Sequence, residues 1–291
     1  MRIGLQMPVF SHADTSHLAG WMKNVAQAAD GNGFASLWVM DHFFQLGGWL
    51  GPAEDPMLEG YSALCYFAGL TERIMLGTMV TGVIYRYPAV LIKTVTTLDV
   101  LSGGRAFFGV GAAWNGEESK ALGLPFPPTK ERFEILEDTL QLAHQMWKGD
   151  SSAYSGTHVN APYPHSNPQP IQQPHPPILI GGMGEKKTLR FVAQYGDACN
   201  LFGGAEMDVL KHKLEVLKRH CDDLGRDYDE IDKTSLFTID PAEESDDQIV
   251  ENLSRFAEMG FDEVMVNIKQ AYDADVVVRI GQEIIPQVAE L

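Results

Sequence analysis

Short, nearly continuous hydrophobic runs alternate along this chain with longer stretches in which hydrophobic residues recur at helical spacing. The stretches predict eight helices, at residues 17–30, 61–70, 88–101, 129–147, 185–195, 207–224, 246–259 and 274–288. The runs predict eight strands, at residues 3–7, 35–40, 74–80, 106–110, 178–180, 198–202, 234–239 and 263–268. Strands that are hydrophobic throughout are typical of a parallel sheet covered on both faces. The pattern therefore predicts an α/β fold, a (β/α)8 TIM barrel, with a doubly wound open sheet as the alternative.

A proline-rich insertion at residues 149–177 interrupts this alternation. Seven of the sixteen prolines lie there, and proline at that density prevents a helix. The segment predicts a short β-ribbon over the rim of the barrel, followed by an extended run into the next strand. A linker between two domains is the alternative. We favour the ribbon, so residues 1–291 are expected to form a single domain.

The formal net charge of −17 limits the classes of partner. Nucleic acids and anionic membranes are bound by clustered Lys and Arg, so neither is expected as a partner. No run approaches the roughly 18 apolar residues of a membrane helix, and the amino terminus shows no secretion pattern. The sequence therefore predicts a cytoplasmic protein that acts on a small molecule. Cys65, Cys199 and Cys221 are expected to be free thiols.

Functional residues of a parallel barrel lie where the strands end, and one strand ends in an acid and an imidazole. Asp41 and His42 directly follow the hydrophobic strand at residues 35–40. A carboxylate beside an imidazole suits proton transfer near neutral pH, so both residues are candidate catalytic groups. A hydrogen-bonded pair that only terminates the strand is the alternative.

A second strand, at residues 178–180, runs into the glycine-rich turn Gly181, Gly182, Met183 and Gly184, and a helix is expected next. Glycines let the backbone approach a phosphate closely, and the start of a helix offers free N–H groups with a positive potential. The turn is therefore a candidate anion site, and a tight turn without a ligand is the alternative. Three cations of the expected helix are candidates to add positive charge: Lys186, Lys187 and Arg190.

Other catalytic motifs are weak or absent. The run GVGAAW at residues 109–114 resembles a dinucleotide fingerprint but lacks its third glycine. The sequence contains no GxSxG elbow, no HExxH and no HxH at a strand end, so a metal site is not expected.

Three blocks of the sequence, taken together, resemble a known family. They read SLWVMDHF from Ser36, LGTMVTGVIYRYPAVLIKTVTTLDVLSGGRAFFGVGAAWN from Leu76, and PPILIGGMGEKKTLRFVAQYGDACN from Pro176. In this order and spacing they resemble the deazaflavin-dependent branch of the bacterial luciferase-like superfamily. The resemblance covers nearly the whole chain and is only generic after about residue 240.

The resemblance implies a TIM-barrel oxidoreductase that binds coenzyme F420, a deazaflavin, at the carboxyl ends of the strands, and it implies a homodimer. A cis peptide at Met79–Val80 would back the deazaflavin ring. Residues 111–113 would line the cofactor, residues 181–184 would hold its phosphate, and Asp41 would lie near the ring. The residues implied to bind the cofactor are Asp41, Met79, Val80, Thr81, Gly111, Ala112, Ala113, Gly181, Gly182, Met183 and Gly184.

The implied reaction moves hydride between C5 of the deazaflavin and an organic substrate. His42 would protonate the substrate in one direction and act as the base in the other. Aromatic side chains are candidate walls of a dry pocket: Phe43, Phe44, Trp49 and Trp114.

Two departures from the family pattern bear on the substrate. Members that oxidise sugar phosphates have a carboxylate where Trp114 stands and a tryptophan where Leu46 stands. An apolar carbonyl, enone or alcohol therefore fits better, although Glu117 or Glu118 is a candidate to replace the missing carboxylate. Two alternative functions stay open, an FMN-dependent monooxygenase of the same fold and a deazaflavin-binding protein without turnover.

Overall fold

The computed structural model describes residues 1–48, 50–269 and 273–291, and a parallel sheet forms its centre. The strands run in the order β3-β2-β1-β11-β10-β9-β8-β5-β4, and every pair within this sheet is parallel. Their bounds are β1 (Arg2–Met7), β2 (Ser36–Val39), β3 (Met75–Thr78), β4 (Thr81–Gly82), β5 (Phe108–Gly111), β8 (Ile178–Gly181), β9 (Ala198–Phe202), β10 (Asp232–Ile239) and β11 (Glu263–Ile268).

The sheet curls into a nearly closed barrel, because its two end strands are parts of one interrupted strand. β3 pairs with β2, β4 pairs with β5, and a parallel bridge between Leu76 and Ala106 joins the two edges. The predicted TIM barrel is therefore confirmed, and the open sheet is wrong. The eight predicted strands are all present, the third one as β3, and β4 lies just beyond its predicted end at residue 80.

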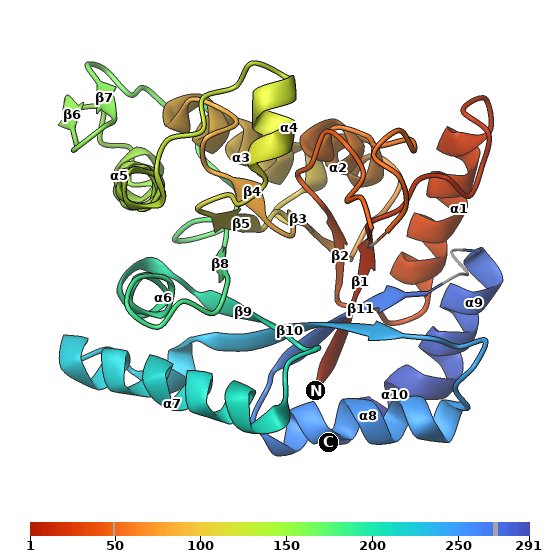
Figure 1. Ribbon diagram of the computed structural model, residues 1–291. Coiled ribbons are helices and arrows are strands. Elements are labelled where there is room, and N and C mark those ends of the chain that lie inside the picture. The colour runs from red at the N-terminus through yellow and green to blue at the C-terminus, as the bar shows by residue number, and fades with distance from the viewer. Residues whose placement is uncertain (49, 270–272) are drawn as a thin grey trace.

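Helices surround the barrel, and each of the eight predicted helices is present in the described part of the chain (Figure 1). The predicted helix at 274–288 consists of α9, a π-helical segment (Ile280–Ile284) and α10. The other bounds are α1 (Leu18–Gly31), α2 (Gly60–Ala68), α3 (Pro88–Ser102), α5 (Thr129–Trp147), α6 (Thr188–Tyr195), α7 (Met207–Leu224), α8 (Asp246–Glu258), α9 (Ala274–Arg279) and α10 (Ile285–Ala289).

Two helical details differ from the sequence-based expectation. α6 begins at Thr188, because residues 185–187 still belong to the turn after β8. A short helix after β5, α4 (Gly116–Ala121), was not predicted. A local contact stabilises the start of this helix, because the Asn115 side chain accepts the N–H of Glu118 at 3.4 Å and so caps the helix.

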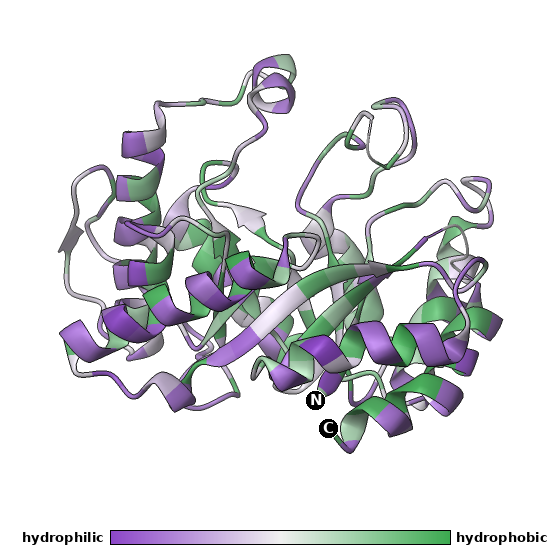
Figure 2. Cartoon of the chain, turned by 60° about the horizontal axis from the view of Figure 1, so that its bottom comes forward, coloured by the Kyte–Doolittle hydropathy of each residue, from purple (hydrophilic) through white to green (hydrophobic). Residues whose placement is uncertain are grey.

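Large side chains fill the barrel interior, and glycine in two strands leaves room for close contacts there. The Trp38 ring is fully buried inside, beside Met79, Leu179, Ala198 and Met265. A Cβ at Gly77 would collide with this ring, and a Cβ at Gly109 would collide with a backbone carbonyl of β3. Figure 2 shows hydrophobic residues concentrated in the central strands and bands of both kinds on the outer helices.

The insertion forms the expected ribbon, with β6 (Tyr154–Ser155) antiparallel to β7 (Asn160–Ala161). The placement over the rim is wrong, because the ribbon lies against the outer helix α5 (Figure 1). The buried Asp138 carboxylate of α5 accepts the backbone N–H groups of Thr157, His158 and Val159 at 3.0, 2.7 and 3.0 Å. A buried carboxylate in mid-helix needs donors, and the ribbon turn supplies them.

None of the helices in the described residues has the length and hydrophobicity that a membrane crossing requires. Cys65, Cys199 and Cys221 are free thiols, as expected.

Candidate active site

A cavity of about 370 Å³ opens at the carboxyl ends of β2, β4, β5 and β8. Ten of the predicted site residues line it: Asp41, His42, Met79, Val80, Thr81, Gly111, Ala112, Ala113, Gly181 and Gly182. Residues from three blocks that are far apart in the sequence therefore meet at one place. Met183 and Gly184 do not line the cavity and continue the turn beyond it.

One wall of the cavity is built where β3, β5 and β8 end. The Met79–Val80 peptide is cis, as the resemblance implied. A Cβ at Gly111 or at Gly181 would come within 3.0 Å of the Val80 side chain. Glycine at both positions therefore allows Val80 to lie between the two neighbouring strands.

Asp41 does not hold His42, contrary to the interpretation of the two residues as a pair. Its buried carboxylate accepts both terminal N–H groups of Arg86, at 2.8 and 2.9 Å. Arg86 also contacts Glu59, the residue that caps α2. Burial raises the pKa of Asp41, and the bonds from Arg86 oppose this shift. Burial lowers the pKa of Arg86, but its bonds to Asp41 more than compensate and raise it.

His42 is held by Glu118 instead, a residue of the unpredicted helix α4. His42 Nδ1 lies 3.0 Å from Glu118 Oε2, and Glu118 Oε1 accepts the N–H of Phe43 at 3.0 Å. The His42 ring is 13% exposed and Trp114 packs edge-on against it at 5.6 Å. Because Nδ1 is engaged, Nε2 is the ring nitrogen that is available to the cavity.

Two hydroxyl groups contact Thr81, which lines the cavity. Tyr61 Oη and Thr78 Oγ1 contact Thr81 Oγ1 at 2.7 and 2.6 Å. Burial raises the pKa of Tyr61, so its hydroxyl stays protonated. Tyr85 lines the cavity itself, and burial also raises its pKa, with the carboxylates of Glu118 and Asp41 adding to the effect.

The glycine turn at the other end of the cavity presents backbone amides. Gly182 has φ of +118°, which favours glycine, and its N–H is already donated to the carbonyl of Asn200 at 3.1 Å. The amides of residues 183–188 have no acceptor within the described part of the chain. The amides suited to an anion are therefore those after Gly182, at the start of α6.

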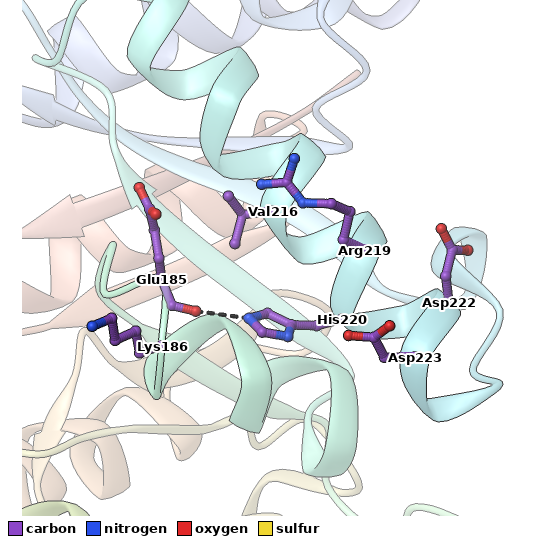
Figure 3. A pocket seen from close by; sticks show the side chains of 7 residues that line it. All are labelled: Glu185, Lys186, Val216, Arg219, His220, Asp222 and Asp223. Carbon is purple, nitrogen blue, oxygen red and sulfur yellow. Dashed lines mark hydrogen bonds between the residues drawn. The ribbon is translucent and has the colours of Figure 1, made fainter.

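The three cations expected to assist this turn do not line the cavity. Lys186 lies in a separate surface groove of about 410 Å³ with Arg219 and His220 of α7 (Figure 3). The Lys187 ammonium lies over the Phe191 ring at 5.5 Å. Arg190 is exposed on α6. Backbone amides, rather than Lys or Arg side chains, therefore form the candidate anion site.

The turn is fastened to α7 through Glu185. The Glu185 carboxylate accepts from Lys213 Nζ at 2.6 Å and lies 3.2 Å from His212 Nε2. The Glu185 carbonyl accepts from His220 Nε2 at 2.7 Å, the bond drawn in Figure 3. Three side chains of α7 thus fix the segment that precedes α6.

The residues that form the cavity walls differ in part from those expected. Trp114 lines the cavity, whereas Phe43 packs behind it on Tyr85 at 5.3 Å, and Phe44 is not among the lining residues. Trp49 lies outside the described residues. Sequence patterns missed the lining residues Tyr85, Phe133, Leu136, Thr188, Asn200 and Leu236. Most of these lie within helices and strands, where hydrophobic spacing does not distinguish a pocket wall from core.

A family model matches nearly the whole chain. The model described as luciferase-like monooxygenase matches residues 1–277. An F420-dependent glucose-6-phosphate dehydrogenase of Kineococcus radiotolerans is 30% identical over 230 residues, which are 77% of this chain and 66% of the relative. This chain therefore matches slightly less than two thirds of that relative.

Solved structures show the same fold at low sequence identity. The coenzyme F420 dependent tetrahydromethanopterin reductase of Methanopyrus kandleri has a TM-score of 0.80 at 17% identity, over 99% of this chain and 100% of that one. A type II Baeyer-Villiger monooxygenase of Pseudomonas putida in complex with FMN has a TM-score of 0.73 at 16% identity, over 98% of each chain.

Proposed function

Because this chain belongs to the luciferase-like monooxygenase family, we propose that it is an oxidoreductase that uses coenzyme F420 to move hydride to or from an organic substrate. A relative named for F420-dependent glucose-6-phosphate dehydrogenation supports the cofactor. The observation on which the proposal rests is that one cavity joins His42 to the glycine turn before α6. A candidate proton-transfer group and a candidate anion site therefore border the same cavity, where one bound ligand can contact both.

The residues present fit such a cofactor. Val80, flanked by Gly111 and Gly181, offers an apolar surface against which an aromatic ring packs. The unpaired amides after Gly182 suit a phosphate, and Thr188 lines the cavity at the same end. When bound, a deazaflavin accepts or supplies hydride at C5.

The protein's own contribution is proton transfer and exclusion of water. In oxidation, His42 Nε2 would take the O–H proton of an alcohol while the bound deazaflavin would supply the hydride acceptor, so that C–O becomes C=O. In reduction, His42 returns the proton to the carbonyl oxygen. Either direction needs His42 within reach of the oxygen that reacts.

An uncharged, apolar substrate fits the rest of the cavity. Trp114, Phe133, Leu136 and Leu236 line it, and its described lining contains no Lys or Arg. A sugar phosphate would find no cationic side chain there, and we assign the free backbone amides to the cofactor. We therefore propose apolar ketones, enones or secondary alcohols as substrates. The homodimer stays a prediction, which sedimentation velocity would test.

A negative charge introduced at position 188 tests both the proposed cofactor and the proposed phosphate site. Thr188→Asp is expected to weaken F420 binding at least about tenfold, because a carboxylate would lie beside the phosphate. Thr188→Asn is the matched control, since it has nearly the same shape without the charge. Tryptophan quenching during titration with F420, and separately with FMN, measures both affinities.

The outcomes separate the alternatives. Micromolar F420 binding that Thr188→Asp alone loses, with weak FMN binding, supports the proposal. Preference for FMN, with oxygen consumption in the presence of a reductant, would instead identify a monooxygenase, as the family description and an FMN-bound structural neighbour suggest. Tight F420 binding without turnover of cyclohexanone, 2-propanol or an enone would identify a binding protein.

Weakening the contact between Glu185 and α7 is expected to have a smaller effect on F420 affinity. His220→Ala removes the donor to the Glu185 carbonyl and should loosen the turn, and one hydrogen bond contributes about 0.5–1.5 kcal/mol. F420 affinity is expected to fall about two- to tenfold in the same titration. His212→Ala is the control, because Lys213 still holds the Glu185 carboxylate. Equal losses in both variants would contradict a specific role of His220.

A further inference from the structure

Glu118 is a buried acid with no cationic Lys or Arg partner in the described residues. Its side chain is 0% exposed. The groups around its carboxylate are His42 Nδ1 at 3.0 Å, the N–H of Phe43 at 3.0 Å and Asn115 Nδ2 at 3.4 Å. Burying a carboxylate is costly unless donors satisfy it, and all three of these groups are able to donate. Arg86, which lies beside Asp41 in the site, is bonded to Asp41 and Glu59 instead.

This arrangement determines where the proton of the His42 ring lies. A carboxylate has only acceptors, so the ring nitrogen that faces it must carry hydrogen. In neutral imidazole only one nitrogen carries hydrogen, and Nδ1 is the nitrogen of His42 that faces Glu118. With the hydrogen on Nδ1, His42 Nε2 keeps its lone pair, and His42 is one of the residues that line the cavity.

We propose that Glu118 is a positioning residue that fixes the tautomer and orientation of His42, so that Nε2 receives the substrate proton. This deepens the proposed function, because it names the group that prepares His42 for catalysis. A negative charge 3.0 Å from the ring also offsets the positive charge that His42 gains when it takes that proton. The bond to the Phe43 N–H holds the same carboxylate against the strand end that bears His42.

Replacing Glu118 by Gln tests the tautomer directly. The Gln amide has one acceptor and one donor group, and the N–H of Phe43 requires the acceptor. The amide NH2 would then face His42 Nδ1, which becomes an acceptor and shifts the ring proton to Nε2. The substitution keeps the size of the side chain and inverts the tautomer.

The first readout needs no cofactor and no substrate. Two-bond ¹H–¹⁵N correlation spectra of the imidazole rings report which nitrogen is protonated, and His42→Asn identifies the His42 signals by their loss. The Nδ1–H form is expected in the wild type and the Nε2–H form in Glu118→Gln. An Nε2–H ring in the wild type, or an unchanged ring in the variant, would overturn the proposal whatever the enzyme's cofactor is.

The second readout uses F420-dependent reduction of cyclohexanone. Glu118→Gln is expected to lower kcat about 10²–10⁴-fold, as removal of a tautomer-fixing carboxylate does in other enzymes, with KM and F420 affinity within about threefold. Glu117→Gln is the matched control, because this neighbour in α4 is exposed and carries the same charge. A loss shared by Glu117→Gln, or a loss confined to F420 affinity, would overturn the positioning role.

Discussion

His42→Asn is expected to lower the rate of F420-dependent cyclohexanone reduction about 10²–10⁴-fold, the usual contribution of a general acid or base. Asn has no group that gives up or takes a proton in this pH range. It retains an N–H donor, so Glu118 keeps a partner and the local fold should survive. F420 affinity, measured by tryptophan quenching, is expected to stay within about twofold of the wild type, because His42 serves proton transfer rather than cofactor binding.

His165→Asn is the control, since this histidine is exposed in the insertion and stacks on Tyr163. It should leave kcat, KM and affinity unchanged. A His42→Asn enzyme that retains more than a third of wild-type kcat would assign the proton transfer elsewhere. Tyr85 is the next candidate, because its protonated hydroxyl group belongs to a residue that lines the cavity.

Arg86→Met is expected to lower the free energy of unfolding by about 3–5 kcal/mol, because it leaves the Asp41 carboxylate buried without its counter-ion. Urea denaturation followed by tryptophan fluorescence measures the loss. Arg279→Met is the control, since the Arg279 pair with Asp246 is half exposed and contributes at most about 1 kcal/mol. A loss in Arg86→Met no larger than in this control would show that Asp41 does not depend on Arg86.

The loss in Arg86→Met should depend on pH. Burial raises the folded pKa of Asp41, and removing the guanidinium removes the contribution that opposes this shift. When the folded pKa of a carboxylate is raised, the unfolded chain loses the proton at lower pH than the folded protein does, so the destabilising effect is absent below the unfolded pKa of about 4. The stability difference between the two proteins should therefore grow as the pH rises above about 4, and it should level off once the pH exceeds the folded pKa of Asp41 in the variant.

A second substitution separates charge from packing. Asp41→Asn combined with Arg86→Met removes both charges, and this double variant should recover stability above pH 5 relative to Arg86→Met alone. No recovery would mean that the packing of the Arg86 guanidinium group on the Tyr61 ring, with Cζ 4.9 Å from the ring centroid, contributes more than its ion pair with Asp41.

The fold could be predicted from the sequence because its evidence is local. A strand buried on both faces must be hydrophobic at nearly every position, and a helix that covers it must be hydrophobic on one side. Both patterns extend through the chain, so all eight strand–helix units were recovered, with errors of a few residues at their ends. α4 was missed because six mostly polar residues have no such pattern.

The location of the site was predictable for a related reason. Parallel strands end at one edge of the barrel, so Asp41, Thr81, Gly111 and Gly181 had to lie near one another. The order of the residues along the chain is enough to place them together, and the structure gathers them around one cavity.

The partners of the site residues depended on tertiary structure alone. Asp41 and His42 are adjacent in sequence, but Asp41 is bonded to Arg86 and His42 to Glu118, which lies 76 residues further along the chain. Successive side chains at a strand end point in different directions, so neighbours in sequence need not pair. Which carboxylate meets which cation is decided when buried charges must all find donors at once, and only the assembled barrel sets those distances.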